Sequence, residues 1–157
     1  SPSMNLVDAQ IDGGHVSFGG FTIPLPEPLT GRNGPVILGI RPTDFEHDAA
    51  ADPSLPRLRV RADVVEDLGA EMHVIFPIDA PRVSAEAVRA AADASGEDEM
   101  TLLADDQRAV FTAVLDARHP IRPGTDVALA LDPTCLYFFE SVTGLALDGH
   151  ARETAHA

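Results

Sequence analysis

The spacing of hydrophobic and polar residues along the chain predicts short β-strands joined by turns. The most continuous apolar run, residues 36–40, lies between Asn33-Gly34-Pro35 and Pro42, which is typical of a strand covered on both faces. In residues 58–64 apolar residues alternate with arginine and aspartate, which predicts a half-buried strand with Leu58, Val60, Ala62 and Val64 on one face. Residues 4–7 and 10–11 together predict one further strand. The others are predicted at residues 15–18, 21–23, 73–78, 108–117, 127–131 and 136–139.

Glycine pairs, prolines and one alanine-rich stretch define the connections. Asp12-Gly13-Gly14 and Gly19-Gly20 supply the positive dihedral angles of tight turns, so the first three strands are expected to form a meander. The acidic stretch 44–56 is expected to be an exposed loop. Residues 83–95 break the strand pattern, because Ser84 can cap a helix and alanines follow it. One short inserted helix is therefore predicted there, within a long insertion at about 79–106.

These elements predict an all-β fold of about nine or ten short antiparallel strands, curled into OB-like barrel units. Residues 1–147 are expected to form the domain, with two barrel-like sub-units, and residues 148–157 a mobile tail. Gly39, inside the central strand, predicts a bulge or the close approach of another backbone. Pro42 ends that strand and leaves Arg41 at the rim of the core, where the guanidinium needs a carboxylate or carbonyl partner. With a carboxylate partner, Arg41→Ala is expected to cost on the order of 3 kcal/mol.

Charge and residue usage exclude several functions. The chain has 11 basic and 25 acidic residues and a net charge of -14, which opposes binding to nucleic acid and anionic lipid. Every basic residue is an arginine, so the chain has no lysine for a Walker A loop and is not expected to bind ATP in that way. Its single cysteine, Cys135, cannot form an internal disulfide and is expected to be a buried strand residue, in keeping with a reducing cytosol.

No catalytic, cofactor-binding or metal-binding residue is predicted. Glu66 and Asp67 are adjacent acids, but neighbours in an extended chain point to opposite faces. The six histidines lack zinc-ligand spacing and are expected to be ordinary surface residues. The acidic run 97–99 lacks the ligand spacing of a calcium loop and is interpreted as a solvated face.

Three short motifs, in order, frame nearly the whole chain. They are Ser1-Pro2-Ser3-Met4-Asn5, then Gly39-Ile40-Arg41-Pro42, then residues 136–144, Leu-Tyr-Phe-Phe-Glu-Ser-Val-Thr-Gly. They resemble the domain junction, the Gly-Ile-Arg-Pro-Glu signature and the closing His-Leu-Phe-Asp-x-x-Thr-Gly of one family. This family is the C-terminal regulatory (TOBE/OB-like) domain of ATP-binding subunits from carbohydrate-importing ABC transporters, the maltose-importer type. The chain departs from the family pattern at Thr43 (usually Glu), Tyr137 (usually His) and Glu140 (usually Asp).

The resemblance implies a regulatory and dimerisation domain, excised from a subunit that imports sugars or sugar-like solutes, including glycerol-3-phosphate-type substrates. The nucleotide-binding domain, with its ATP and Mg, would lie outside this chain. The implied partners are a second copy of the subunit, its own nucleotide-binding domain, membrane permease subunits and a regulatory protein, at the cytoplasmic face of the plasma membrane. The implied interface and structural residues are Gly39, Ile40, Arg41, Pro42, Tyr137, Phe139, Thr143 and Gly144.

Two other functions stay open at this stage. Small barrels related to this family bind oxyanions such as molybdate, which requires convergent backbone amides or cations. A strongly acidic chain offers few cations for that purpose. An enzyme is the third hypothesis, although no Ser-His-Asp arrangement can be argued from spacing alone.

Overall fold

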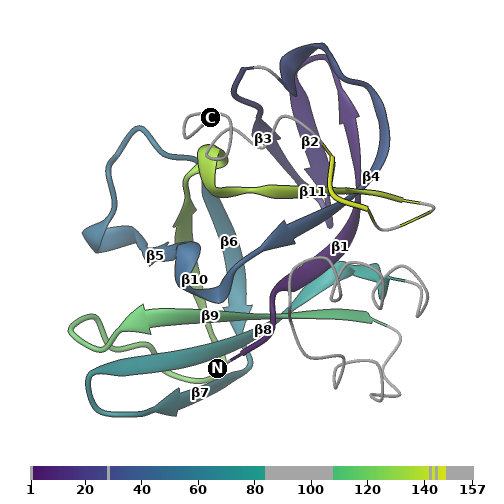
Figure 1. Cartoon of the computed structure of the whole chain (residues 1–157). Helices are drawn as coiled ribbons and strands as arrows, with labels where there is room; N and C mark the ends of the chain where they lie inside the picture. The colour runs from purple at the N-terminus through teal and green to yellow at the C-terminus, as the bar shows by residue number, and fades with distance from the viewer. Residues whose placement is uncertain (1, 28, 84–107, 142, 144, 148–157) are drawn as a thin grey trace.

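The computed structural model describes residues 2–27, 29–83, 108–141, 143 and 145–147. Within these residues the chain forms eleven strands, all paired antiparallel, in three sheets (Figure 1). The predicted all-β fold is therefore confirmed. The predicted helix at 83–95 lies outside the described residues except for Val83, and so does the predicted tail at 148–157. The division into two barrel-like sub-units stays a prediction.

The largest sheet has the strand order β11-β4-β1-β2-β3. Its strands are β1 (Asn5–Asp12), β2 (His15–Phe18), β3 (Phe21–Pro24), β4 (Gly34–Ile40) and β11 (Tyr137–Glu140). The first three strands form the predicted meander, and both connecting turns contain glycines with positive φ, such as Gly13 at 58°. In β4, residues 36–40 are all buried, which confirms the strand covered on both faces.

Two three-stranded sheets complete the fold. One has the order β5-β10-β6 and the other β7-β8-β9. Their strands are β5 (Phe45–His47), β6 (Arg57–Ala62), β7 (Val64–Asp67), β8 (Glu71–Pro81), β9 (Arg108–Asp116) and β10 (Thr125–Leu131). In Figure 1, β1 runs from the N-terminus beside β8 and β9 up into the five-stranded sheet, so it links the lower and upper parts of the molecule.

One hydrophobic core is shared by all three sheets. At its centre, the rings of Phe45 and Phe76 lie 5.7 Å apart edge to face, and those of Phe76 and Phe111 lie 5.9 Å apart. Each of the three rings is at most 2% exposed. Because they come from β5, β8 and β9, these contacts pack two sheets directly against each other.

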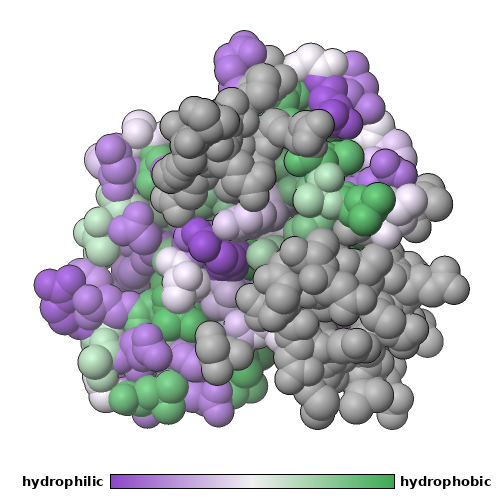
Figure 2. Space-filling view, viewed as in Figure 1, coloured by the Kyte–Doolittle hydropathy of each residue, from purple (hydrophilic) through white to green (hydrophobic). Residues whose placement is uncertain are grey.

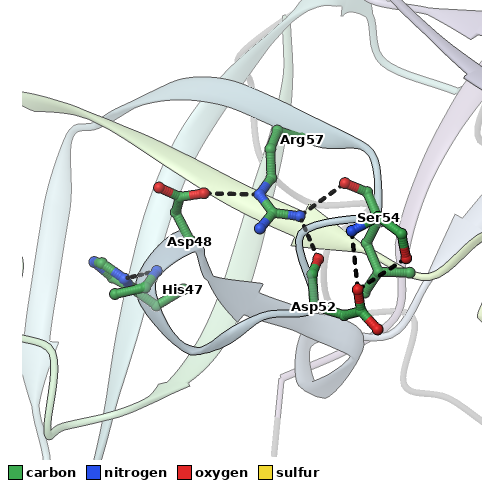
Figure 3. Close-up of polar contacts among 7 residues, drawn as sticks. His47, Asp48, Asp52, Ser54 and Arg57 are labelled. Atoms are coloured by element: carbon green, nitrogen blue, oxygen red, sulfur yellow. Dashed lines mark hydrogen bonds and ion pairs between the residues drawn. The ribbon is translucent and has the colours of Figure 1, made fainter.

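The prediction that residues 44–56 form an exposed loop was wrong in part. The segment contains β5, whose backbone pairs with β10, and then the 3-10 helix Asp48–Ala50. The rest is held by Arg57, which donates to the Asp48 carboxylate at 2.7 Å and to the Asp52 and Leu55 carbonyls (Figure 3). The alternating pattern needed for a strand spans only three residues here, too few to stand out in the sequence.

Three further expectations need correction. Val64 does not share the buried face of Leu58, because β6 ends at Ala62 and the chain crosses into another sheet, leaving Val64 47% exposed. Cys135 is buried as predicted, but in a short 3-10 helix, Pro133–Cys135, before β11. Gly39 marks no bulge, since the pairing of β4 with both neighbours runs through it without a shift.

Candidate functional site

The second and third motifs meet in space although about 100 residues separate them. β11 pairs directly with β4, so that Tyr137 lies opposite Gly39 and Phe139 opposite Ile37. Cross-strand neighbours share one face of a sheet. Gly39 from the second motif and Tyr137 and Phe139 from the third are thus brought together at one edge of the five-stranded sheet.

Gly39 is required here by packing. A Cβ atom at this position would lie 2.5 Å from the Met4 sulfur and 3.0 Å from Cε2 of Phe139. Both side chains belong to a small cluster on the outer face of the sheet, around the buried Ile37. The close approach predicted at Gly39 therefore comes from the side chains of the first and third motifs and not from a backbone.

Arg41 stands where β4 ends. Its Nε donates to Asp44 at 2.9 Å and its Nη2 to the same carboxylate at 3.4 Å, and its guanidinium lies 5.3 Å from the centre of the Tyr137 ring. The hydrogen bonds to Asp44 raise the pKa of Arg41. The predicted carboxylate partner is confirmed, and it lies one position after Thr43, where the family usually has Glu.

Asn5, from the first motif, forms a hydrogen bond with Ile40 of the second motif. It is 5% exposed, and its Nδ2 donates to the Ile40 carbonyl at 3.0 Å and to the Thr112 carbonyl at 2.9 Å. Its Oδ1 accepts from the Thr112 amide at 2.7 Å. One side chain therefore joins β1, the end of β4 and the middle of β9.

Three further signature residues, Ile40, Pro42 and Thr143, lie in the described part of the chain. Ile40 and Pro42 are buried. Thr143 accepts a hydrogen bond at its Oγ1 from the Leu145 amide at 3.2 Å, which closes the turn after β11. Gly144 lies outside the described residues.

A cleft of about 560 Å³ opens beside Arg41, between the end of β4 and the β7-β8-β9 sheet. Pro2, Pro42, Leu68 and Val114 give it apolar walls, with Arg41, Glu71 and His73 as the charged or titratable groups. His73 Nε2 lies 3.5 Å from the Glu71 carboxylate, so these two groups face each other as a pair. The cleft presents no serine, cysteine or lysine nucleophile among its lining residues.

The histidines are less uniform than predicted. His47 and His119 stack, with ring centres 5.0 Å apart and planes 20° from parallel. Burial, followed by the nearby His119, lowers the pKa of His47 below its usual value, and His47 Nδ1 accepts from the Ala49 amide at 3.0 Å (Figure 3). The spacing of 72 residues between the two histidines gave no signal of their contact.

Two further observations concern only the described part of the chain. It contains no group of three or more His, Cys, Asp or Glu residues placed to hold a metal ion. It also contains no helix that is both long and apolar enough to cross a bilayer.

Because the Arg41 side chain is 37% exposed, the structure lowers the expected effect of Arg41→Ala. Water screens the ion pair, but Asp44, only 11% exposed, would lose its partner. We expect a loss of about 1–2 kcal/mol in the free energy of unfolding, measured by urea denaturation. Arg61→Ala is the control, since its 4.0 Å pair with Asp126 is more than half exposed at both ends. Equal stability of the two variants would contradict the structural role of Arg41.

Comparison with known proteins agrees with this geometry. A family model described as the MalK OB fold domain matches residues 1–45, which end just after the Arg41–Asp44 pair. The chain is 38% identical over 72 residues, 45% of its length, to the sn-glycerol-3-phosphate import ATP-binding protein UgpC of Jannaschia sp. (strain CCS1). It is 29% identical over 165 aligned positions, 94% of its length, to the trehalose import ATP-binding protein SugC of Mycobacterium tuberculosis (strain CDC 1551 / Oshkosh).

The matched regions cover 19% of UgpC and 38% of SugC, so the chain spans well under half of these relatives. The OB-fold match supports the predicted OB-like architecture of the all-β fold. The family match and the two relatives together confirm the resemblance predicted from the three motifs: the chain is similar to the MalK/UgpC-like C-terminal domain of sugar-importer ATP-binding subunits.

Proposed function

We propose that this chain is the regulatory and dimerisation domain of an ABC importer's ATP-binding subunit, and that it holds two such subunits together while their nucleotide sites open and close. The imported solute is a sugar or a sugar-like molecule, including glycerol-3-phosphate-type substrates. The observation that carries the proposal is the MalK-type OB fold match, together with the convergence of the three family motifs at one corner. Two nucleotide domains that separate after hydrolysis need a contact that does not depend on ATP.

An exposed apolar patch on the β7-β8-β9 sheet supports the pairing role. The strand register puts Val64, Ile75, Pro77 and Val110 on the same outer face, and we call these four residues the outer-face patch. Val64 and Val110 are 47% and 49% exposed. Hydrophobic surface is visible over the part of the molecule where β7 and β8 lie (Figure 2). A patch of this kind suits an isologous contact, in which the same surface is used by both copies.

The oxyanion-binding alternative finds less support in the cleft beside Arg41. The guanidinium there is already bonded to Asp44, and the Glu71 carboxylate lines the same cleft. An added anion would meet this negative charge within a chain whose net charge is -14.

The proposal makes the chain an accessory part of an ATPase with no nucleotide site of its own. We expect titration calorimetry with Mg-ATP to give no binding heat, because the chain has no lysine and no Walker A spacing. A subunit that includes an intact nucleotide-binding domain is the positive control. Micromolar ATP binding by the 157-residue chain would contradict the proposal.

A further inference from the structure

An open groove of about 430 Å³ lies on the outer face of the five-stranded sheet. Its floor follows the strand register, since Pro35, Gln10 and Ser17 form one row across β4, β1 and β2. The Gly19-Gly20 turn also lines it and presents backbone with no side chains beyond Cα. The groove is separate from the cleft beside Arg41, and the two share no lining residue.

Asp8 is the only charged residue among those that line the groove. Its cross-strand neighbour is Ile37, which is fully buried and lies in the same row as Phe139. The Asp8 carboxylate therefore lies at the border of the apolar cluster around Ile37 and Phe139, and it remains partly exposed to water. It makes no hydrogen bond or ion pair with any residue in the part of the chain that the structure describes.

Among the described residues, none compensates the Asp8 carboxylate for the hydration that it loses by partial burial. Burial raises the pKa of Asp8 above its usual value, and no cation of the described residues opposes this effect. Asp12, on the same strand and the same face, lies outside the groove. A cation placed at Asp8 would therefore gain more than one placed at Asp12.

We propose that this groove is a docking site for one basic side chain, carried by an extended segment of a partner protein. The aliphatic stem of an arginine or lysine can lie against Pro35 and the glycine turn while its charged end reaches Asp8. Gln10 and Ser17 lie alongside as further polar partners. The net charge of -14 draws basic segments to the chain and repels polyanions. A single carboxylate suits one cation within a peptide better than a free polyamine.

The test uses the blocked peptide acetyl-Ala-Leu-Arg-Leu-Ala-amide and the same peptide with citrulline in place of arginine. Citrulline keeps the shape of the side chain and removes its charge. Titration followed by NMR should give saturable shifts of the Gly19 and Gly20 amides with the arginine peptide, and binding about tenfold weaker with citrulline. Saturation should also lower the pKa of Asp8, since a bound cation favours the carboxylate.

Two matched variants test whether the arginine peptide binds in the groove. Asp8→Asn and Asp12→Asn change the net charge equally and lie on the same face of β1. We expect Asp8→Asn to weaken binding of the arginine peptide about tenfold and Asp12→Asn to leave it nearly unchanged. Equal binding of both peptides, equal effects of both variants, or shifts confined to other residues would overturn the proposal. Self-association of the chain that Asp8→Asn abolishes would also overturn it, by making a second copy the occupant.

Discussion

Replacing Phe76 with alanine is expected to lower the free energy of unfolding by about 3–5 kcal/mol, the largest effect of any substitution considered. The Phe76 ring is fully buried and contacts Phe45 on one side and Phe111 on the other. Its removal leaves a cavity where two sheets pack together, and the surrounding strands cannot close it without breaking their pairing. Thermal unfolding should shift down by roughly 10 °C.

Phe21→Ala provides the control for this prediction. Phe21 is only half-buried at the edge of the five-stranded sheet and packs beside Phe18. Its loss removes the same atoms from a site that water can fill, so the melting temperature should fall by less than half as much. If Phe76→Ala melts no lower than Phe21→Ala, the shared core is not the main source of stability.

Asn5→Ala is expected to lower the free energy of unfolding by about 2–4 kcal/mol, because it leaves buried backbone groups without their hydrogen-bond partners. The Ile40 carbonyl loses its side-chain donor, and the Thr112 amide and carbonyl lose both partners supplied by Asn5. Urea denaturation measures the loss. Hydrogen exchange should also speed up at Thr112, because its amide would then lack an acceptor.

The control for Asn5 is Asn33→Ala. Asn33 also accepts a hydrogen bond from a backbone amide, that of Gly13 at 3.2 Å, but at an exposed site where water can replace it. We expect a change close to zero. Equal losses in the two variants would show that the bonds of Asn5 add nothing beyond an ordinary surface contact.

The sequence predicted well the features that local patterns determine. The meander at residues 5–24 follows from glycine pairs between short alternating runs, and the end of β4 follows from Pro42. The need of Arg41 for a carboxylate follows from its place at the end of an apolar run. These signals act over a few residues, so they can be read without knowing the rest of the fold.

Features that depend on distant parts of the chain were missed. The strand β5 forms because β10, about 80 residues later, supplies its partner. Asn5 contacts Thr112, 107 residues away, and no spacing rule links them. The junction motif did include Asn5, so its presence was visible, but its role as a buried link was not. Asp44 was likewise not predicted as the partner of Arg41, because the family pattern has its glutamate at position 43.

Tyr137, where the family usually has His, contacts Arg41 directly. Arg41 turns back over its own 3-10 turn to reach Asp44, and in doing so its guanidinium lies over the Tyr137 ring. An aromatic face stabilises a cation at this distance. The arginine at the end of β4 is therefore held by one carboxylate and one aromatic ring.

The central claim is that this domain pairs two ATPase subunits, and sedimentation equilibrium of the complete subunit without nucleotide tests it most directly. Val110→Asp puts a charge into the outer-face patch, whereas Leu145→Asp puts one at a site that is 61% exposed and outside that patch. We expect Val110→Asp to weaken subunit pairing about tenfold or more and Leu145→Asp to leave it unchanged. The claim would be contradicted if both the Val110→Asp subunit and a subunit that lacks residues 39–157 still paired fully.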